Sequence, residues 1–142
     1  MAAVRLLRGT WSELGHLAAP VRRRVFIEEQ GIPVELEWDE LDRASRHIVG
    51  MTDYDTPIGT VRLTPNAHVG RMAVLPVWRR RGIGKQLLQA VLEEAAAAGM
   101  RSVALSAQVP VIPFYEKLHF EPYGEIFQDV GIPHRMMRRA LQ

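Results

Sequence analysis

The feature that most constrains how this chain can fold is an apolar segment that runs into a basic, glycine-containing turn and then into an amphipathic helix. Residues 69–75 predict a strand, and the turn at residues 79–85 has the sequence RRRGIGK. Residues 82–98 carry apolar side chains at helical spacing and predict the helix. The apolar segment at residues 103–107 predicts a second strand, so the whole unit predicts a parallel strand–helix–strand crossover.

The rest of the chain predicts more strands and helices around this unit. Thr10 and Glu13 fit a capping box that begins the first helix, and Pro20 predicts that this helix is kinked or restarts there. An acidic loop or short helix is expected at residues 34–43 and a short helix at residues 111–118. Further strands are expected at residues 4–7, 47–51, 58–63, 120–127 and 135–141. This order predicts an α+β fold with a mixed, mostly antiparallel sheet and helices on both of its faces.

Composition excludes several kinds of protein. The chain has 142 residues, which predicts one domain over residues 1–142. It contains no cysteine, and this excludes a disulfide framework, a thiolate metal site and a cysteine acyl intermediate. The apolar runs are too short to span a membrane, and the first nine residues show no signal peptide pattern. We therefore expect a cytoplasmic protein with no membrane partner.

The turn at residues 79–85 has the chemistry of an anion site. Unpaired N–H groups and the helix dipole favour an anion at a helix start, and Gly82 and Gly84 let the backbone approach a phosphate closely. The glycine spacing matches neither a Walker loop nor a dinucleotide-binding loop. We predict a diphosphate site here, with a tight and solvated basic turn as the alternative. The predicted ligands are Arg79, Arg80, Arg81, Gly82, Ile83, Gly84 and Lys85.

At this turn the chain resembles the GNAT family of N-acetyltransferases. The turn matches the family pattern Gln/Arg-x-x-Gly-x-Gly/Ala, which binds the diphosphate of coenzyme A. Further segments resemble the ElaA-type branch: residues 25–30 (VFIEEQ), the acidic stretch that ends near His47, residues 114–118 (FYEKL) and residues 131–134 (GIPH). The resemblance implies the GNAT-type acyl-CoA N-acyltransferase fold, with acetyl-CoA as the co-substrate.

The same resemblance implies how the thioester arm of the co-substrate is held. The backbone of Met72, Ala73 and Val74 is implied to pair with the pantetheine arm as an additional strand would. The amides of the arm need hydrogen-bond partners, and a splayed strand edge offers them. One N–H group of this edge would also polarise the thioester oxygen.

Two side chains are candidates for the proton transfers of amide formation. The resemblance implies that Tyr115, within the segment FYEKL, points at the sulfur of coenzyme A and acts as the acid. His134 follows a Gly-Ile-Pro turn, in a context similar to that of the base histidine of glyphosate acetyltransferases, and a histidine titrates near neutral pH. The alternative for Tyr115 is a core aromatic residue. The alternative for His134 is a structural histidine, in which case a water molecule is the base.

The acceptor is predicted less narrowly. Arg22, Arg24 and Gln108 are candidates to bind an anionic group of the acceptor, with solvated helix arginines as the alternative. The acidic residues 35–42 suit a cationic polyamine, although solvation is the more usual role of such a run. His47 is expected to be a satisfied core histidine, with a position in the lining of the same cleft as the alternative. No metal site is expected, because no histidine has a partner at metal-ligand spacing.

These observations favour an enzyme that transfers an acetyl group from acetyl-CoA to a small-molecule amine or a peptide amine by direct attack in a ternary complex. A CoA-binding regulatory module without turnover has the same basic turn and is the alternative. The basic clusters also suit nucleic acid, but no recognition-helix or aromatic-rich basic pattern accompanies them, so no nucleic-acid partner is expected. The sequence leaves open whether two copies pair as a homodimer.

Overall fold

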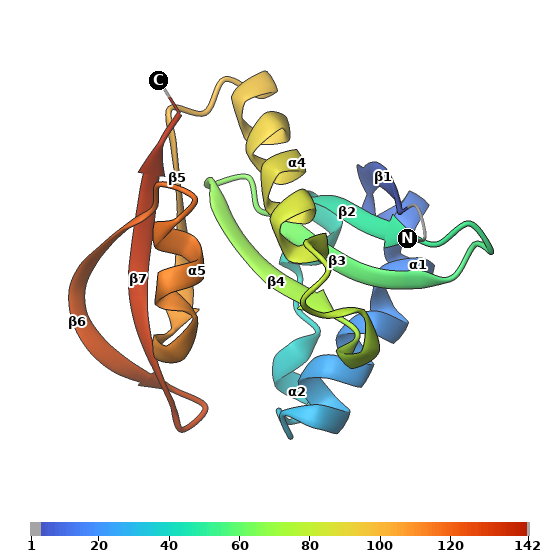
Figure 1. Cartoon of the computed structure of the whole chain (residues 1–142), viewed down its shortest axis with the longest axis horizontal. Helices are drawn as coiled ribbons and strands as arrows, with labels where there is room; N and C mark the ends of the chain where they lie inside the picture. The colour runs from blue at the N-terminus through green and yellow to red at the C-terminus, as the bar shows by residue number, and fades with distance from the viewer. Residues whose placement is uncertain (1–3, 142) are drawn as a thin grey trace.

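The computed structural model describes residues 4–141, and a seven-stranded sheet forms its centre (Figure 1). The order of the strands across the sheet is β1-β2-β3-β4-β5-β7-β6. The strands are β1 (Arg5–Thr10), β2 (Arg46–Met51), β3 (Pro57–Leu63), β4 (His68–Val74), β5 (Ser102–Gln108), β6 (Glu121–Asp129) and β7 (Ile132–Ala140). Only β4 and β5 are parallel neighbours, so the predicted mixed, mostly antiparallel sheet of an α+β fold is confirmed.

Helices connect the strands, and those at residues 11–22 and 83–97 lie where helical periodicity predicts them. They are α1 (Trp11–Arg22), the π-helical segment (Arg23–Glu29), α2 (Val34–Glu37), α3 (Leu41–Ala44), α4 (Ile83–Ala97) and α5 (Ile112–Glu116). Short 3-10 turns precede α4 and α5, at Pro76–Trp78 and Val109–Val111. No helix within residues 4–141 has the length and apolarity needed to cross a membrane.

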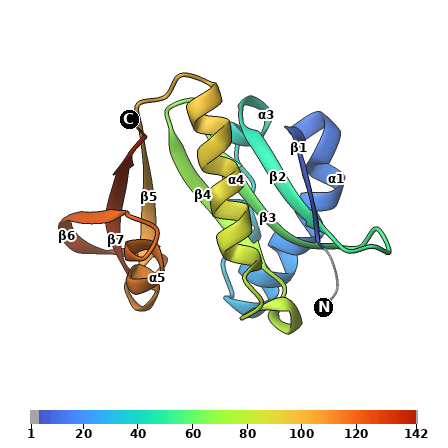
Figure 2. The same ribbon diagram turned by 45° about the horizontal axis from the view of Figure 1, so that its top comes forward.

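The sheet is covered on both faces because consecutive residues of a strand point in opposite directions. Ile48 of β2 belongs to the core cluster that contains Leu87 of α4, whereas its neighbour Val49 packs with Leu14 and Ala18 of α1. Figure 2 shows α4 crossing one side of β3 and β4, with α1 on the other side. Complete burial of a side chain such as Leu87 stabilises the fold by about 1.5–3 kcal/mol.

The first helical region differs from its prediction. The capping box at Thr10 and Glu13 is present, but α1 continues through Pro20 to Arg22 instead of restarting at the proline. The chain then winds as a π-helix, in which the N–H of Gln30 reaches the carbonyl of Val25 at 3.1 Å. Pro20 has no N–H to donate, so it costs the helix one bond, and the wider winding follows three residues later.

The two central parallel strands pair only at one end. His68 lies opposite Ala104, Val69 lies opposite Leu105, and no further pairs follow between β4 and β5. Both views show the two strands diverging beyond this point (Figures 1 and 2). Residues 70–74 therefore keep one backbone edge that no strand of the sheet covers.

A bulge in β4 accompanies this divergence. Arg62 pairs with Gly70 and Thr60 pairs with Ala73, so two steps along β3 correspond to three steps along β4. The extra residue falls beside Arg71, whose φ of 49° lies in the left-handed region. Bulges bend the strand that contains them. The bend directs β4 away from β5, and a cleft opens between the two strands.

Candidate active site

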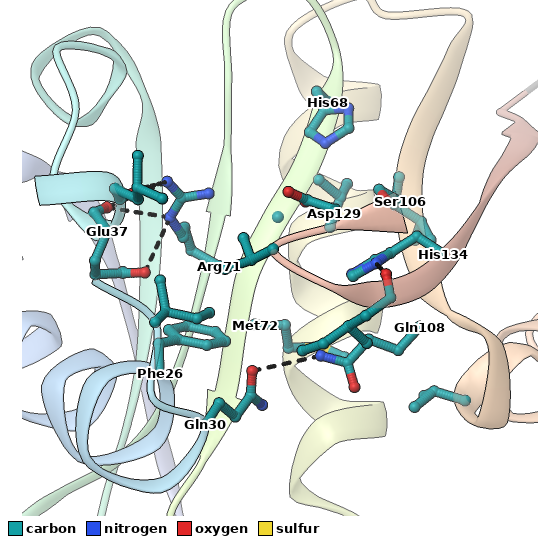
Figure 3. Close-up of a pocket in the computed structure, with 18 of the residues that line it drawn as sticks. Phe26, Gln30, Glu37, His68, Arg71, Met72, Ser106, Gln108, Asp129 and His134 are labelled. Carbon is teal, nitrogen blue, oxygen red and sulfur yellow. Dashed lines mark hydrogen bonds and ion pairs between the residues drawn. The ribbon is translucent and has the colours of Figure 1, made fainter. Parts of the chain in front are cut away.

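A cleft of about 500 Å³ opens where β4 and β5 diverge (Figure 3). One wall comes from the π-helical segment and α2, and the floor from β4. The opposite wall comes from β5, α5 and the hairpin between β6 and β7. Four segments that lie far apart in the sequence therefore meet at one concave site, which is the usual form of a small-molecule site.

Tyr115 lies in this cleft, on the short helix α5 that follows β5. Its half-buried ring packs edge-on against Phe114 and Phe120, with ring centroids 5.1 and 5.9 Å away. Burial raises the pKa of Tyr115 to about 12. The hydroxyl makes no hydrogen bond to any residue from 4 to 141, so it remains a protonated donor available to a ligand.

His134 stands in the same cleft, as the third residue of β7. Its Nδ1 lies 2.7 Å from the carbonyl oxygen of Ile132, and its ring stacks on Phe127 at a centroid distance of 5.9 Å. A carbonyl oxygen can only accept, so Nδ1 carries the proton. In the neutral ring Nε2 is then the proton acceptor. The position of His134 fits the predicted base, with its tautomer and orientation held by the backbone.

The basic turn before α4 presents unpaired amides. The backbone N–H groups of residues 80–85 have no acceptor within the described chain, since the first helical bond of α4 is donated by Gln86 to Gly82. Gly82 has a φ of 80°, and a Cβ added there would meet nothing within 4 Å. The exposed Arg81 lies 4.9 Å from the Trp78 ring, and Arg80 and Lys85 are exposed. These residues fit a diphosphate, which needs close N–H donors and positive charge.

Arg79 is held differently from the rest of the turn. Its Nε donates to the carbonyl of Val74 at 2.9 Å, and its two terminal nitrogens donate to the Glu29 carboxylate at 2.8 and 2.7 Å. These hydrogen bonds raise the pKa of Arg79 and lower the pKa of Glu29. Arg79 thus joins the end of β4 to the π-helical segment, and three of its five N–H groups are already used.

The three strand residues predicted to hold the thioester arm lie in different environments. The side chain of Met72 lines the cleft, and Ala73 is buried. Val74 pairs with Gly59 on the β3 side, and its carbonyl accepts from Arg79. The edge of these residues toward β5 is the part that no other strand covers.

The prediction that Arg22 binds the acceptor is wrong. Arg22 is 1% exposed, and its Nε lies 2.6 Å from Glu37 while Nη1 lies 2.8 Å from Asp42. It is therefore a buried structural group rather than a solvated helix arginine. Arg24 is exposed and does not line the cleft, whereas Gln108 does and donates to Gln30 at 3.4 Å.

The acidic stretch is also not simply solvated. Glu37 and Asp42 are buried, and together with Asp39 they pair with three arginines in a closed charge ring. In this ring every charged group has two partners of opposite sign. Its members, in order, are Arg22, Glu37, Arg71, Asp39, Arg62 and Asp42. The expectation that His47 is a satisfied core histidine is confirmed, because it is 1% exposed and its Nε2 lies 2.8 Å from the carbonyl oxygen of Asp42.

Three cleft residues were not singled out from the sequence. His68, Arg71 and Asp129 line the cleft from β4 and from the β6–β7 hairpin (Figure 3). Burial, followed by the positive charges of Arg62 and Arg71, lowers the pKa of His68, which favours its neutral ring. No local pattern marks these residues, because they meet only where β4 separates from β5.

Fold and cleft together define a member of the acetyltransferase (GNAT) domain family, whose chemistry is acyl transfer. The family model for this domain matches residues 22–141, and the chain belongs to the family. The predicted GNAT-type fold is thereby confirmed, and so is the family resemblance that the sequence of the basic turn indicated.

Individual relatives agree with this assignment. The chain is 37% identical over 123 residues to the uncharacterized N-acetyltransferase YjcF of Bacillus subtilis (strain 168), covering 84% of this chain and 87% of that protein. It is 29% identical to protein ElaA of Escherichia coli (strain K12), over 92% of this chain and 96% of ElaA. The crystal structure of Escherichia coli ElaA matches with a TM-score of 0.82 and 27% identity, over 98% of this chain and 99% of that chain. A crystal structure described as an acyl-CoA N-acyltransferase from Pseudomonas aeruginosa matches with a TM-score of 0.86, 25% identity and coverage of 97% and 100%. The predicted ElaA-type branch is confirmed.

Proposed function

We propose that this protein is an acetyl-CoA-dependent N-acetyltransferase that acetylates a small primary amine by direct attack in a ternary complex. One observation carries the proposal: residues 80–85, at the basic turn and the first turn of α4, have six consecutive unpaired N–H groups, and the uncovered edge of β4 leads from there into a cleft that holds Tyr115 and His134. The turn suits the diphosphate and the strand edge suits the amides of the pantetheine arm. The cleft suits the reacting groups.

The proposed roles follow from the chemistry of the two side chains. The amine nitrogen attacks the thioester carbon, so a C–N bond forms and the C–S bond breaks. His134 Nε2 accepts the proton that the nitrogen must lose, and the Tyr115 hydroxyl donates toward the departing sulfur. An N–H group on the edge of β4 that β5 leaves uncovered would polarise the thioester oxygen. The released thiolate takes its proton from solvent, and His134 returns its proton to solvent after each turnover.

A CoA-binding regulatory module is the second candidate, since it needs only the turn and the strand edge. The cleft favours the enzyme, because a sensor has no use for an oriented proton acceptor and an unpaired hydroxyl donor in the same cavity.

Calorimetry with coenzyme A tests the binding half of the proposal, and it should give one site per chain. Incubation with acetyl-CoA and a set of primary amines tests the catalytic half. Release of free thiol together with an acetylated amine of the expected mass supports an enzyme. Binding without any consumption of acetyl-CoA supports the module.

A further inference from the structure

The charges around the acceptor end of the cleft do not suit an anionic acceptor. The charged residues among those that line the cleft are Glu37, Arg71 and Asp129. Arg71 belongs to the charge ring, with Nη2 3.2 Å from Asp39 and Nε 3.4 Å from Glu37. The ring contains three arginines and three carboxylates, so its net charge is zero. An incoming carboxylate or phosphonate would have to compete with carboxylates that already hold Arg71.

Asp129 is the charge in the cleft that has no counterpart. It is the last residue of β6 and is exposed, and it makes no ion pair with any arginine or lysine among residues 4–141. Figure 3 shows Asp129 with Ser106 and His134 on the wall opposite Glu37 and Arg71. Burial, followed by the positive charges of Arg62 and Arg71, lowers the pKa of His68, which favours its neutral ring. The Nδ1 of His134 lies 2.7 Å from the carbonyl oxygen of Ile132.

The remaining wall of the cleft is apolar. Leu36 is 55% exposed, Val111 37% and Val130 47%, and all three line the cleft from α2, from the turn before α5 and from the hairpin. Phe26 and Ile32 continue this surface inward. Exposed apolar side chains that gather around one cavity indicate a surface that a ligand covers.

We infer that the acceptor is a small apolar monoamine, whose ammonium group is bound by the carboxylate of Asp129 and whose hydrocarbon body lies on Leu36, Val111 and Val130. This inference rests on the proposed function and names the acceptor class of the same cleft. The ammonium ion gives one proton to solvent before attack, and its second departing proton goes to His134. The volume of about 500 Å³ must also hold the thioester end of the co-substrate, which limits the acceptor to a small molecule.

Three acceptors that share a five-carbon amine chain separate the classes. Pentylamine has one ammonium group and an apolar end, cadaverine has a second ammonium group at that end, and norleucine adds a carboxylate beside the amine. Only pentylamine satisfies both Asp129 and the apolar wall, since the second cation of cadaverine would meet apolar side chains and the carboxylate of norleucine would meet Asp129. We expect kcat/KM with acetyl-CoA to be at least about tenfold higher for pentylamine than for either alternative, which corresponds to about 1.4 kcal/mol.

The variant Asp129→Asn removes the negative charge and keeps the size of the side chain. An interaction of about 1 kcal/mol between partly exposed charges predicts a KM for pentylamine about fivefold higher, with little change in kcat. Glu125→Gln, on the same hairpin but outside the cleft, is the matched control and should leave KM unchanged. A KM that is unaffected by Asp129→Asn, or a preference for norleucine or cadaverine, overturns the inference.

Failure of the proposed function is distinguished by binding. Calorimetric titration of pentylamine into protein saturated with coenzyme A needs no turnover. If acetyl-CoA is not consumed but pentylamine binds, and binds about fivefold more weakly to Asp129→Asn, the acceptor class stands and the catalytic proposal fails. If coenzyme A binds and pentylamine does not, the acceptor class is wrong whatever the enzyme does with other amines.

Discussion

Replacing Tyr115 with phenylalanine removes one hydroxyl group from the cleft and leaves the ring in place. The ring keeps its edge-on contacts with Phe114 and Phe120. No residue from 4 to 141 loses a hydrogen-bond partner, because the hydroxyl bonds to none of them. We therefore expect the free energy of unfolding to change by less than about 0.5 kcal/mol. Any change in rate then reports on the reaction and not on stability.

The size of the rate effect follows from the pKa of the hydroxyl. Burial raises the pKa of Tyr115 to about 12. A free thiol titrates near ~8.5, so the tyrosine holds its proton more tightly than the departing sulfur does. Tyr115 therefore acts mainly as a hydrogen-bond donor to the developing negative charge. A hydrogen bond to a charged group contributes about 1.5–3 kcal/mol, which corresponds to a fall in kcat of about ten- to 150-fold.

The assay is thiol release under saturating acetyl-CoA and amine, combined with calorimetry of coenzyme A binding. The Kd for coenzyme A should change by less than about twofold, because the hydrogen bond strengthens only as the sulfur becomes charged. Tyr54→Phe, at a residue that is 91% exposed in a surface turn, is the control and should behave like the parent protein. An unchanged kcat, or equal losses in kcat and in coenzyme A affinity, would refute the role of Tyr115.

The pKa of Tyr115 also fixes a pH dependence. The hydroxyl is protonated at every pH below its pKa, so it is lost as a donor only when the pH rises through about 12. A decline in kcat between roughly pH 8 and 10 therefore has another origin, and the phenylalanine variant should show the same decline at lower absolute rates. A decline present in the parent protein and absent from the variant would contradict this assignment.

Four other variants test the remaining parts of the structure. Arg22→Met leaves two buried carboxylates without their shared partner and should lower the free energy of unfolding by about 3–5 kcal/mol in urea titrations; a loss below about 1 kcal/mol would argue against the buried pairing. Arg81→Ala should weaken coenzyme A binding about tenfold in calorimetry. The charge-neutral double variant Glu29→Gln/Arg79→Gln should weaken it less than about threefold, because Arg79 is already paired with the Glu29 carboxylate. Equal effects of the two variants would mean that Arg79 does bind the diphosphate. His119 has a φ of 68°, so His119→Gly should raise the free energy of unfolding by about 0.5–1 kcal/mol, and destabilisation would mean that its side chain makes a contact that offsets the strain.

The elements of this fold that could be read from the sequence are those whose signals are local. The capping box at Thr10, the amphipathic pattern of α4 and the short apolar runs of β2 and β3 each depend on residues within about one or two turns or within one strand. The basic turn belongs to the same group, because its N–H groups and its positive charge come from consecutive residues. The parallel crossover followed from the order of these elements and the handedness of the chain.

The errors arose where the direction of a side chain decides its role. Arg22, Arg23 and Arg24 are consecutive in the sequence, yet only Arg22 turns inward. Successive helix residues point about 100° apart, and the composition of a basic run does not reveal which one faces the core. Glu37 and Asp42 were misjudged for the same reason, since a buried carboxylate is tolerated only beside a partner that the sequence does not identify.

By itself, therefore, the sequence determined a basic, glycine-containing turn and the strand–helix–strand unit that carries it, because those properties belong to neighbouring residues. Tertiary structure alone decided which groups line the cleft. His68 and Asp129 share a cavity because β4 pairs with β5 at two positions and then bends away, and because the β6–β7 hairpin folds over the gap. A contact of this kind depends on strand register and on the direction of each side chain, and both are fixed only when the whole sheet assembles.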